Sequence, residues 1–174
     1  FWMLVVTGFL LTIVGFLIEK PLLYALGASE VTYPYASSYL KIYLLGNLFV
    51  MIGLGMNPFV NSQGFGTTGM VTVGLGAVIN IVLDPLFIFV FHLGVQGAAA
   101  ATVLSQLAAA IWVLLFLTGK KPMLWLSLRW QTPDWKIVRQ IVTLGMANFI
   151  VNFTNSLVQV VCNRQLQVYG GDLY

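Results

Sequence analysis

The sequence predicts an all-α, polytopic bundle of membrane-spanning helices, and three observations lead to this fold class. The chain of 174 residues is 59% hydrophobic, and only 7% of its residues are charged. Soluble domains carry about 25% charged residues, so a chain with so few could not cover a surface that faces water. The apolar residues also form runs of about 20, the length that a helix needs to cross a bilayer.

Five runs are long and apolar enough to form spanning helices. We expect them over residues 1–18, 33–60, 68–91, 97–118 and 133–168. The series Thr132, Pro133 and Asp134 is typical of N-cap, N1 and N2 positions, which places the start of the last helix there. The pair Asn57-Pro58 predicts a kink or an end in the second helix.

Basic residues gather in one connection and set the expected orientation. Five of the eight basic residues lie between Lys120 and Arg139. The positive-inside rule therefore places the connection 119–132 in the cytoplasm, and counting back puts 63–66 inside and 91–96 outside. Trp125, Trp130 and Trp135 are typical of an interfacial belt beside that connection. We expect a multi-pass protein of the inner cell membrane.

Other composition features exclude several classes of protein. Basic residues gathered in one connection do not form the stripe that nucleic acids bind, so no nucleic-acid partner is expected. The single cysteine, Cys162, allows no internal disulfide. No nucleophile elbow, zinc-peptidase motif or phosphate loop is present, so we expect neither an enzyme nor a cofactor. The chain begins inside an apolar run and ends after a helix, so we expect further sequence on both sides.

Asp84, in the third expected span, is the leading candidate for a functional residue. A carboxylate inside a membrane span is costly, and it usually faces a bundle interior or a water-filled cavity. Asn80 lies one turn earlier on the same helix face. Pro85 has no N–H, so we expect a helix kink that frees the carbonyl of Ile81. The alternative is a structural Asp84 that shares its proton with a backbone carbonyl at the kink.

The fourth expected span offers polar partners at matching depth. If the hairpin turns at Leu93, Asp84 and Thr102 each lie nine residues from the turn. That distance corresponds to a depth of about 13 Å. Asn80 and Gln106 match in the same way, at thirteen residues. The sequence therefore predicts a small oxygen-lined cation site between the two helices, formed by Asp84, Asn80 and Thr102.

A row of amide side chains along the fifth expected span is the candidate substrate surface. Its members follow spacings of four, three, four and four residues, which places them on one helix face. They are Asn148, Asn152, Asn155, Gln159 and Asn163. Amides in lipid need hydrogen-bond partners, so the row either lines a substrate cavity together with Gln106 or bonds to neighbouring helices. Both readings stay open from the sequence.

Three stretches of this sequence resemble the multidrug and toxic compound extrusion (MATE) transporter family. They are NPFVNSQG over 57–64, GAVINIVLDPLFIF over 76–89 and GVQGAAAATVLSQ over 94–106. The segment 19–29 resembles the connection between that family's third and fourth helices, and 169–172 resembles the end of its seventh. Many members carry Arg where Asn61 stands here, which removes an anchoring role for a basic residue in that loop.

The resemblance implies five of twelve helices in a transporter of two six-helix lobes. Residues 1–118 would be helices three to six of the N-terminal lobe, 119–132 the interlobe linker, and 133–174 the first helix of the C-terminal lobe. The family couples entry of Na⁺ or H⁺ to export of organic, often cationic, compounds, and a monomer is implied. In members of the family, an acid of the first helix joins three residues that match Asn80, Asp84 and Thr102.

Two other function classes remain open at this point. One is a flippase of the same superfamily that moves lipids or lipid-linked precursors, which typically has more cationic residues in its cavity. The other is a membrane protein that transports nothing.

Overall fold

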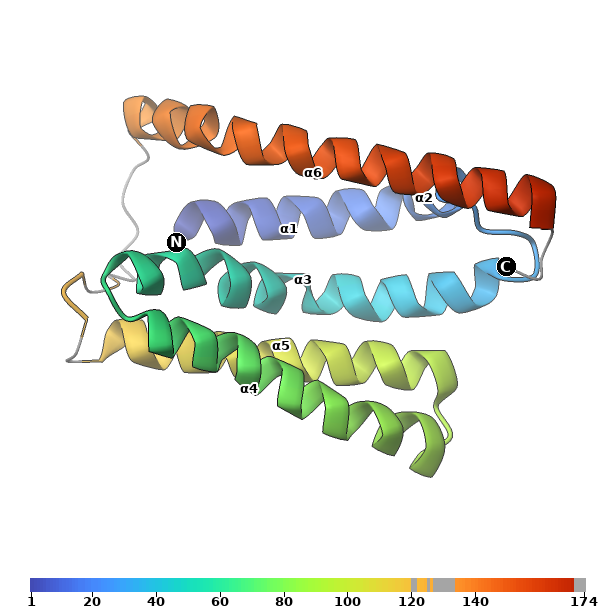
Figure 1. The fold of residues 1–174 in the computed structure, drawn as a ribbon, viewed down its shortest axis with the longest axis horizontal. Coiled ribbons are helices and arrows are strands. Elements are labelled where there is room, and N and C mark those ends of the chain that lie inside the picture. Colours follow the sequence, from blue (N-terminus) through green and yellow to red (C-terminus); the bar gives the residue numbers. More distant parts are fainter. Residues whose placement is uncertain (120–121, 125, 127–133, 171–174) are drawn as a thin grey trace. The chain divides into compact units, whose positions relative to one another are not determined.

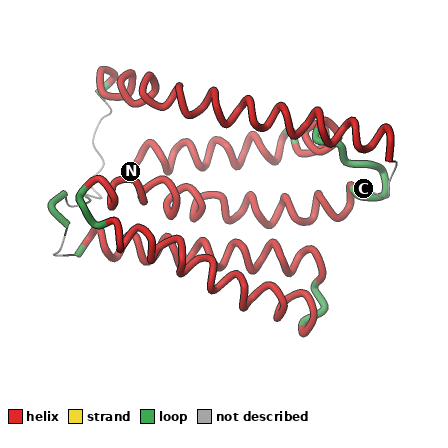
Figure 2. Tube along the Cα trace, viewed as in Figure 1, coloured by secondary structure: helices red, strands yellow, loops and turns green. Residues whose placement is uncertain are grey.

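The computed structural model describes residues 1–119, 122–124, 126 and 134–170, and all regular elements among these residues are helices (Figures 1 and 2). The α-helices are α1 (Trp2–Leu17), α2 (Glu19–Ala25), α3 (Tyr33–Ser62), α4 (Gly66–Pro85), α5 (Gly94–Thr118) and α6 (Trp135–Gly170). A π-helical turn, η1 (Leu86–Val90), continues α4. The predicted all-α class is confirmed.

The number of spans agrees with the sequence prediction once one bent pair is considered. Within the described residues, α3, α5, α6 and the combined α4–η1 segment are long and apolar enough to cross a membrane. The count becomes five if the bent pair α1 and α2 is taken as one span. The predicted first span, 1–18, corresponds to α1, which has 16 residues and reaches spanning length only together with α2, at a bend of 78°.

The structure decides two details of the helix ends. Of the two alternatives at Asn57-Pro58, a kink or an end, the end is wrong, because α3 continues to Ser62, two residues beyond the predicted span 33–60. A proline removes one backbone hydrogen bond, and the buried packing of this helix outweighs that loss. Helix α6 begins at Trp135, and Asp134 caps it, since its Oδ1 accepts a hydrogen bond from the Lys136 N–H at 2.9 Å. Asp134 is thus the cap and not the second helical residue.

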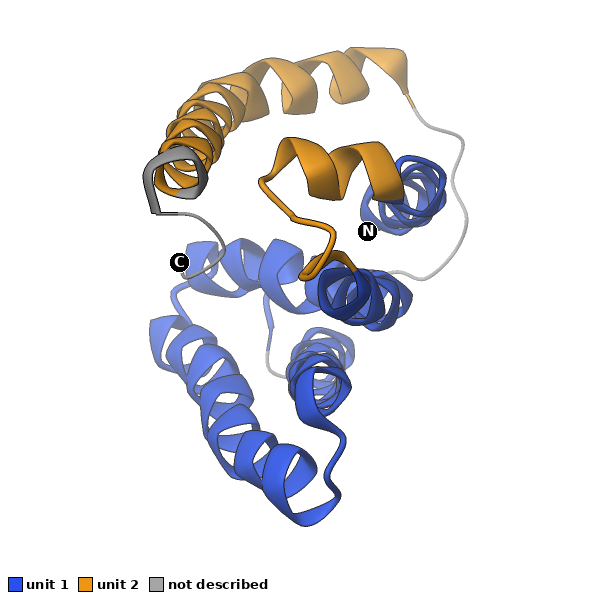
Figure 3. Ribbon diagram, turned by 90° about the vertical axis from the view of Figure 1, so that its right-hand side faces the viewer, with its two compact units in different colours: residues 1–19, 34–128 blue, residues 20–33, 129–174 orange. Residues whose placement is uncertain are grey.

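The chain divides into two compact units, shown in different colours in Figure 3. The first contains residues 1–19 and 34–128, and the second contains residues 20–33 and 129–174. The division into two lobes with a cytoplasmic linker stays a prediction. Its basic residues Lys120, Lys121 and Arg129, as well as Trp125 and Trp130, lie outside the described residues.

The buried apolar core of the first unit lies between α3 and α5. It contains Ile52, Met56 and Val60 of α3, packed with Ala110, Val113 and Leu117 of α5. Gly46, nearer the N-terminus of α3, allows this helix to approach α5 closely, since a Cβ there would lie 2.6 Å from Cγ1 of Val103. Small residues let membrane helices approach in this way and gain van der Waals contact.

Polar bonds tie α1 to α3 inside the first unit. The buried side chain of Asn47 donates to the carbonyl of Gly8 at 3.1 Å and to Oγ1 of Thr12 at 3.2 Å. Thr12 in turn donates to the Leu44 carbonyl at 3.3 Å. Interhelical hydrogen bonds of this kind contribute about 0.6 kcal/mol each in a membrane protein.

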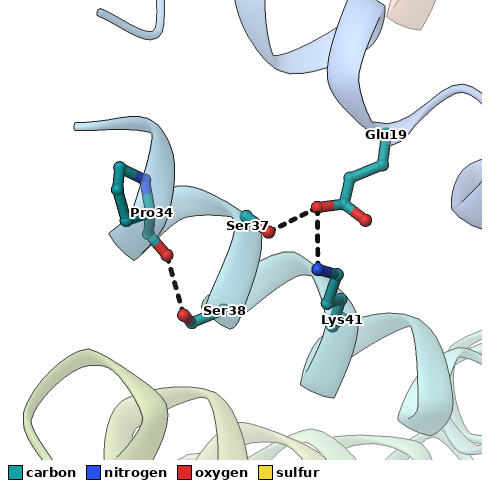
Figure 4. Close-up of polar contacts among 5 residues, drawn as sticks. All are labelled: Glu19, Pro34, Ser37, Ser38 and Lys41. Carbon is teal, nitrogen blue, oxygen red and sulfur yellow. Dashed lines mark hydrogen bonds and ion pairs between the residues drawn. The ribbon is translucent and has the colours of Figure 1, made fainter. Parts of the chain in front are cut away.

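A second polar cluster lies where α1 gives way to α2 (Figure 4). The carboxylate of Glu19 is buried, with the hydroxyl of Ser37 as hydrogen-bond donor to Oε1. The ammonium of Lys41 lies 3.4 Å from the same oxygen. The ion pair gives the half-exposed Lys41 a partner on the preceding helix pair. The cluster fixes the first residue of α2 to α3.

Candidate functional site

The predicted cation-site residues form a hydrogen-bonded cluster between α4 and α5. The amide nitrogen of Asn80 donates to Oδ1 of Asp84 at 3.2 Å and to Oγ1 of Thr102 at 3.4 Å. All three side chains are partly buried. The equal-depth argument is correct in placing these residues together, but Asn80 is the residue that reaches Thr102. One amide therefore links a carboxylate on its own helix to a hydroxyl on the next.

The backbone around the cluster explains its position. Thr102 donates its hydroxyl proton to the Ala98 carbonyl at 2.9 Å, which leaves its lone pairs available to Asn80. Gly97 lets α5 begin close to η1, because a Cβ there would lie 2.8 Å from the Phe87 carbonyl oxygen. The helix changes from α to π directly after Pro85. Single π-helical turns occur frequently at functional sites.

A cavity of about 220 Å³ lies beside the cluster, lined by α3, α4 and α5. Asn80 and Thr102 form part of its wall, and Gln106 extends that wall along α5. The sequence prediction placed Gln106 opposite Asn80, and the structure brings both to the same cavity. The cavity is half open and its lining is more apolar than polar, but it is much larger than one water molecule and its polar side chains can bond to water.

Two groups of residues near this cavity were not part of the predicted site. Gly53 of α3 lines the cavity, although the sequence analysis assigned α3 no role in the site. A second hollow, of about 370 Å³, is lined by Asn57, Asn61 and Gly69 among others. The amide of Asn57 donates to the Gly69 carbonyl at 3.3 Å. The four-residue spacing of the two asparagines on one helix face was the sequence signal for this hollow.

The predicted amide row lies on α6 in the second unit. Its side chains are exposed within the described chain, and Asn152 donates to the Asn148 carbonyl at 2.8 Å. Ser156 donates in the same way to the Asn152 carbonyl at 2.9 Å. These bonds stay within one helix, so they do not decide between a cavity wall and a contact to other helices.

Helices of spanning length, with an amide and a hydroxyl that line a half-open cavity and a carboxylate bonded to that amide, are features of a multi-pass membrane protein. Residues 1–86 match the family model MatE. The chain is 27% identical over 165 residues to the multidrug export protein MepA of Staphylococcus saprophyticus subsp. saprophyticus, which covers 95% of this chain and 37% of that protein. MepA of Staphylococcus aureus is 28% identical over 145 residues, which covers 83% of this chain and 32% of that protein.

Solved structures agree with this assignment. An inward-facing multidrug resistance MATE family transporter of the MOP superfamily has a TM-score of 0.90 and 25% identity, and the match covers 97% of this chain and 39% of that one. A MOP superfamily transporter from Pyrococcus furiosus, described as having a binding pocket of reverse polarity that suggests a different function, has a TM-score of 0.84 and 26% identity over 98% of this chain and 38% of that one.

The chain therefore carries a MATE family domain over residues 1–86, and the relatives and solved structures that it matches are described as multidrug export and MATE proteins. It spans about 37% of the length of the curated relative from Staphylococcus saprophyticus. The described residues thus represent one group of helices of such a protein, with the polar cluster between α4 and α5.

Proposed function

We propose that this chain forms part of a cation-coupled antiporter, in which Na⁺ or H⁺ enters the cell while an organic, often cationic, compound leaves. The observation that carries the proposal is the link from Asn80 to both Asp84 and Thr102 beside a half-open cavity. Relatives described as multidrug export proteins support export as the direction of transport. The protein would act as a monomer in the inner cell membrane, among lipids, with no cofactor besides the coupling ion.

The three side chains provide donor atoms suited to a hard cation. Asp84 offers a carboxylate, Asn80 an amide oxygen and Thr102 a hydroxyl, and hard cations select oxygen ligands. In the observed arrangement the amide nitrogen of Asn80 faces both partners. An ion among them would require the amide to turn and present its oxygen, which breaks both donated hydrogen bonds. A proton on Asp84 would instead remove the negative charge that the amide stabilises.

Coupling follows if the occupied and empty clusters favour different arrangements of α4 and α5. The bond between Asn80 and Thr102 joins these two helices, so its loss or formation changes their contact. A ligand shifts a conformational equilibrium only by its difference in affinity for the two states. The change from α- to π-helix after Pro85 gives α4 a point where such a difference can change its course. The amide row Asn148, Asn152, Asn155, Gln159 and Asn163, with Gln106, would line the substrate cavity.

Gradient-driven efflux in liposomes tests this proposal. The intact protein is reconstituted with ethidium inside the liposomes, and either a Na⁺ or a proton gradient is imposed. Asp84→Asn keeps the acceptor for Asn80 but cannot carry a negative charge, so gradient-driven efflux should fall to the level seen without a gradient. Asn80→Ala and Thr102→Ala should weaken coupling less, because each removes one neutral ligand.

A matched control separates the loss of coupling from a general effect of removing a carboxylate. Glu30→Gln makes the same chemical change at an exposed position outside the predicted spans, and efflux should stay as in the unaltered protein. Efflux by Asp84→Asn at the unaltered rate under the same gradient would show that Asp84 is structural.

A further inference from the structure

The glycines of the first unit differ in what a side chain would meet, and two pairs of them show the contrast. At Gly46 and Gly97, an added Cβ would lie less than 3.0 Å from atoms of α5 or η1. Glycine is therefore required there for helix packing. At Gly53 and Gly76 the nearest atoms would lie 3.5 Å and 3.8 Å away, which are ordinary van der Waals distances. Packing alone would allow alanine at these two positions.

Backbone conformation does not require glycine at these two positions either. Positive φ angles occur at Gly27, Gly64 and Gly94 among the described glycines, whereas Gly53 and Gly76 lie inside α3 and α4. Glycine in the middle of a helix costs about 0.5–1 kcal/mol relative to alanine. Neither packing nor backbone conformation therefore explains why the two buried positions 53 and 76 carry glycine, so the explanation must lie elsewhere.

Both glycines line the cavity beside the cation cluster. Gly53 approaches it from α3 and Gly76 from α4, and each faces Ala109 or its neighbours on α5. Gly76 lies one helical turn before Asn80, and both residues line the cavity. A methyl group at either position would take up volume next to the predicted ligands.

The size and the polar residues of the half-open cavity limit what it can hold. Apolar groups form the larger part of its lining, and Asp84 is connected to it through Asn80 rather than lining it directly. At about 220 Å³ it is smaller than the roughly 300–1,000 Å³ typical of sites for drug-sized ligands. It has room for several water molecules, and Thr102, Ser105 and Gln106 give them polar neighbours. A proton would need the carboxylate alone, whereas a metal cation benefits from neutral oxygens and water as additional ligands.

We infer that Gly53 and Gly76 are specificity-determining residues, which keep the cavity wide enough for Na⁺ to bind together with water. The inference rests on the proposed cation-coupled function and adds to it the two positions that set the size of the site. Neither residue contacts the ion directly; both act by leaving space for the water molecules that complete its coordination.

Alanine at either position should improve the helix and damage the site, two effects that a structural role cannot produce together. In Gly53→Ala and Gly76→Ala of the intact protein, the melting temperature in detergent should stay level or rise. The affinity for ²²Na⁺, measured by equilibrium binding, should fall about fivefold in each variant. This is the change expected when the methyl group displaces one water molecule and its one hydrogen bond is lost. Gly74→Ala is the matched control, since no atom lies within 4 Å of a Cβ there and it lines neither cavity. It should keep full Na⁺ affinity.

Three results of the Na⁺ binding measurement would overturn the inference. They are unchanged Na⁺ affinity in both variants, an equal loss of affinity in Gly74→Ala, and the absence of saturable Na⁺ binding to the unaltered protein. A fall in melting temperature in both variants would also contradict it, because it would show that packing requires these glycines.

If Asp84→Asn abolishes gradient-driven efflux while both variants bind Na⁺ normally, the inference fails and the proposed function stands. If the unaltered protein shows no gradient-driven efflux but the variants lose Na⁺ affinity, the proposed function fails and the role of the glycines stands.

Discussion

Gly46→Ala should destabilise the protein by forcing α3 and α5 apart. The added methyl carbon would lie 2.6 Å from Cγ1 of Val103 and closer still to Cγ2. Carbon atoms prefer separations of about 3.5–4.0 Å, so the helices must shift by about 1 Å. Val103 cannot turn away easily, because a β-branched side chain in a helix has one strongly preferred rotamer. Overpacking of this kind costs about 1–3 kcal/mol.

The same shift should reach the cation cluster. Thr102 precedes Val103 on α5, and its hydrogen bond from Asn80 is already long at 3.4 Å. A displacement of about 1 Å exceeds what this bond tolerates, since side-chain hydrogen bonds are lost near 3.6 Å. We therefore expect Gly46→Ala to reduce both the thermal stability of the purified protein and its gradient-driven efflux.

A second substitution tests whether the contact with Val103 is the cause. Val103→Ala removes both γ-carbons, so the double variant Gly46→Ala/Val103→Ala should recover most of the lost melting temperature, measured by intrinsic fluorescence in detergent. Coupled efflux should recover with it. The reasoning is refuted if Gly46→Ala melts like the unaltered protein, or if the double variant is no more stable than Gly46→Ala alone.

Three further predictions concern topology, the polar cluster around Glu19 and the amide row. In cells, a cysteine at Gln96 should react with an impermeant maleimide only from outside and one at Ser62 only from the cytoplasm; labelling of both from one side contradicts the predicted hairpin. Glu19→Gln keeps an acceptor for Ser37 but loses the ion pair with the half-exposed Lys41, so the free energy of unfolding should fall by less than about 1 kcal/mol. A melting experiment measures this change, and an increase in stability would show that the buried charge is a net cost. Asn155→Ala should change which compounds are exported at normal expression; an unchanged profile with lower thermal stability would assign the row to helix contacts.

The fold class followed from the sequence because lipid imposes a simple constraint on it. A spanning segment must satisfy its backbone hydrogen bonds internally, so an apolar run of sufficient length can only be a helix or part of a closed barrel. Runs of about 20 residues were therefore enough to locate α3, α4, α5 and α6. Boundaries were less certain, as Pro58 inside α3 and the cap at Asp134 show, because a few tertiary contacts or one side-chain bond decide them.

The proximity of Asn80, Asp84 and Thr102 could be predicted because depth in a hairpin of two helices follows from counting residues. Asp84 and Thr102 lie equally far from the turn, so they had to lie at similar height. Counting paired Asp84 with Thr102, whereas in the structure Thr102 is hydrogen-bonded to Asn80. Which of two residues one turn apart meets a neighbour depends on the rotation of each helix about its axis, and counting does not give that rotation.

The sequence by itself determined the class of protein, the helices and the polar residues Asn80, Asp84 and Thr102, because apolar length and the cost of charge in lipid are properties of single segments. Only the tertiary structure decided that α3 contributes to the site, and that Gly53 and Gly76 border a cavity while Gly46 is pressed against Val103. A glycine has no side chain whose chemistry reveals its role. That role depends on how close the next helix comes, and this distance is set by the packing of α3, α4 and α5 together.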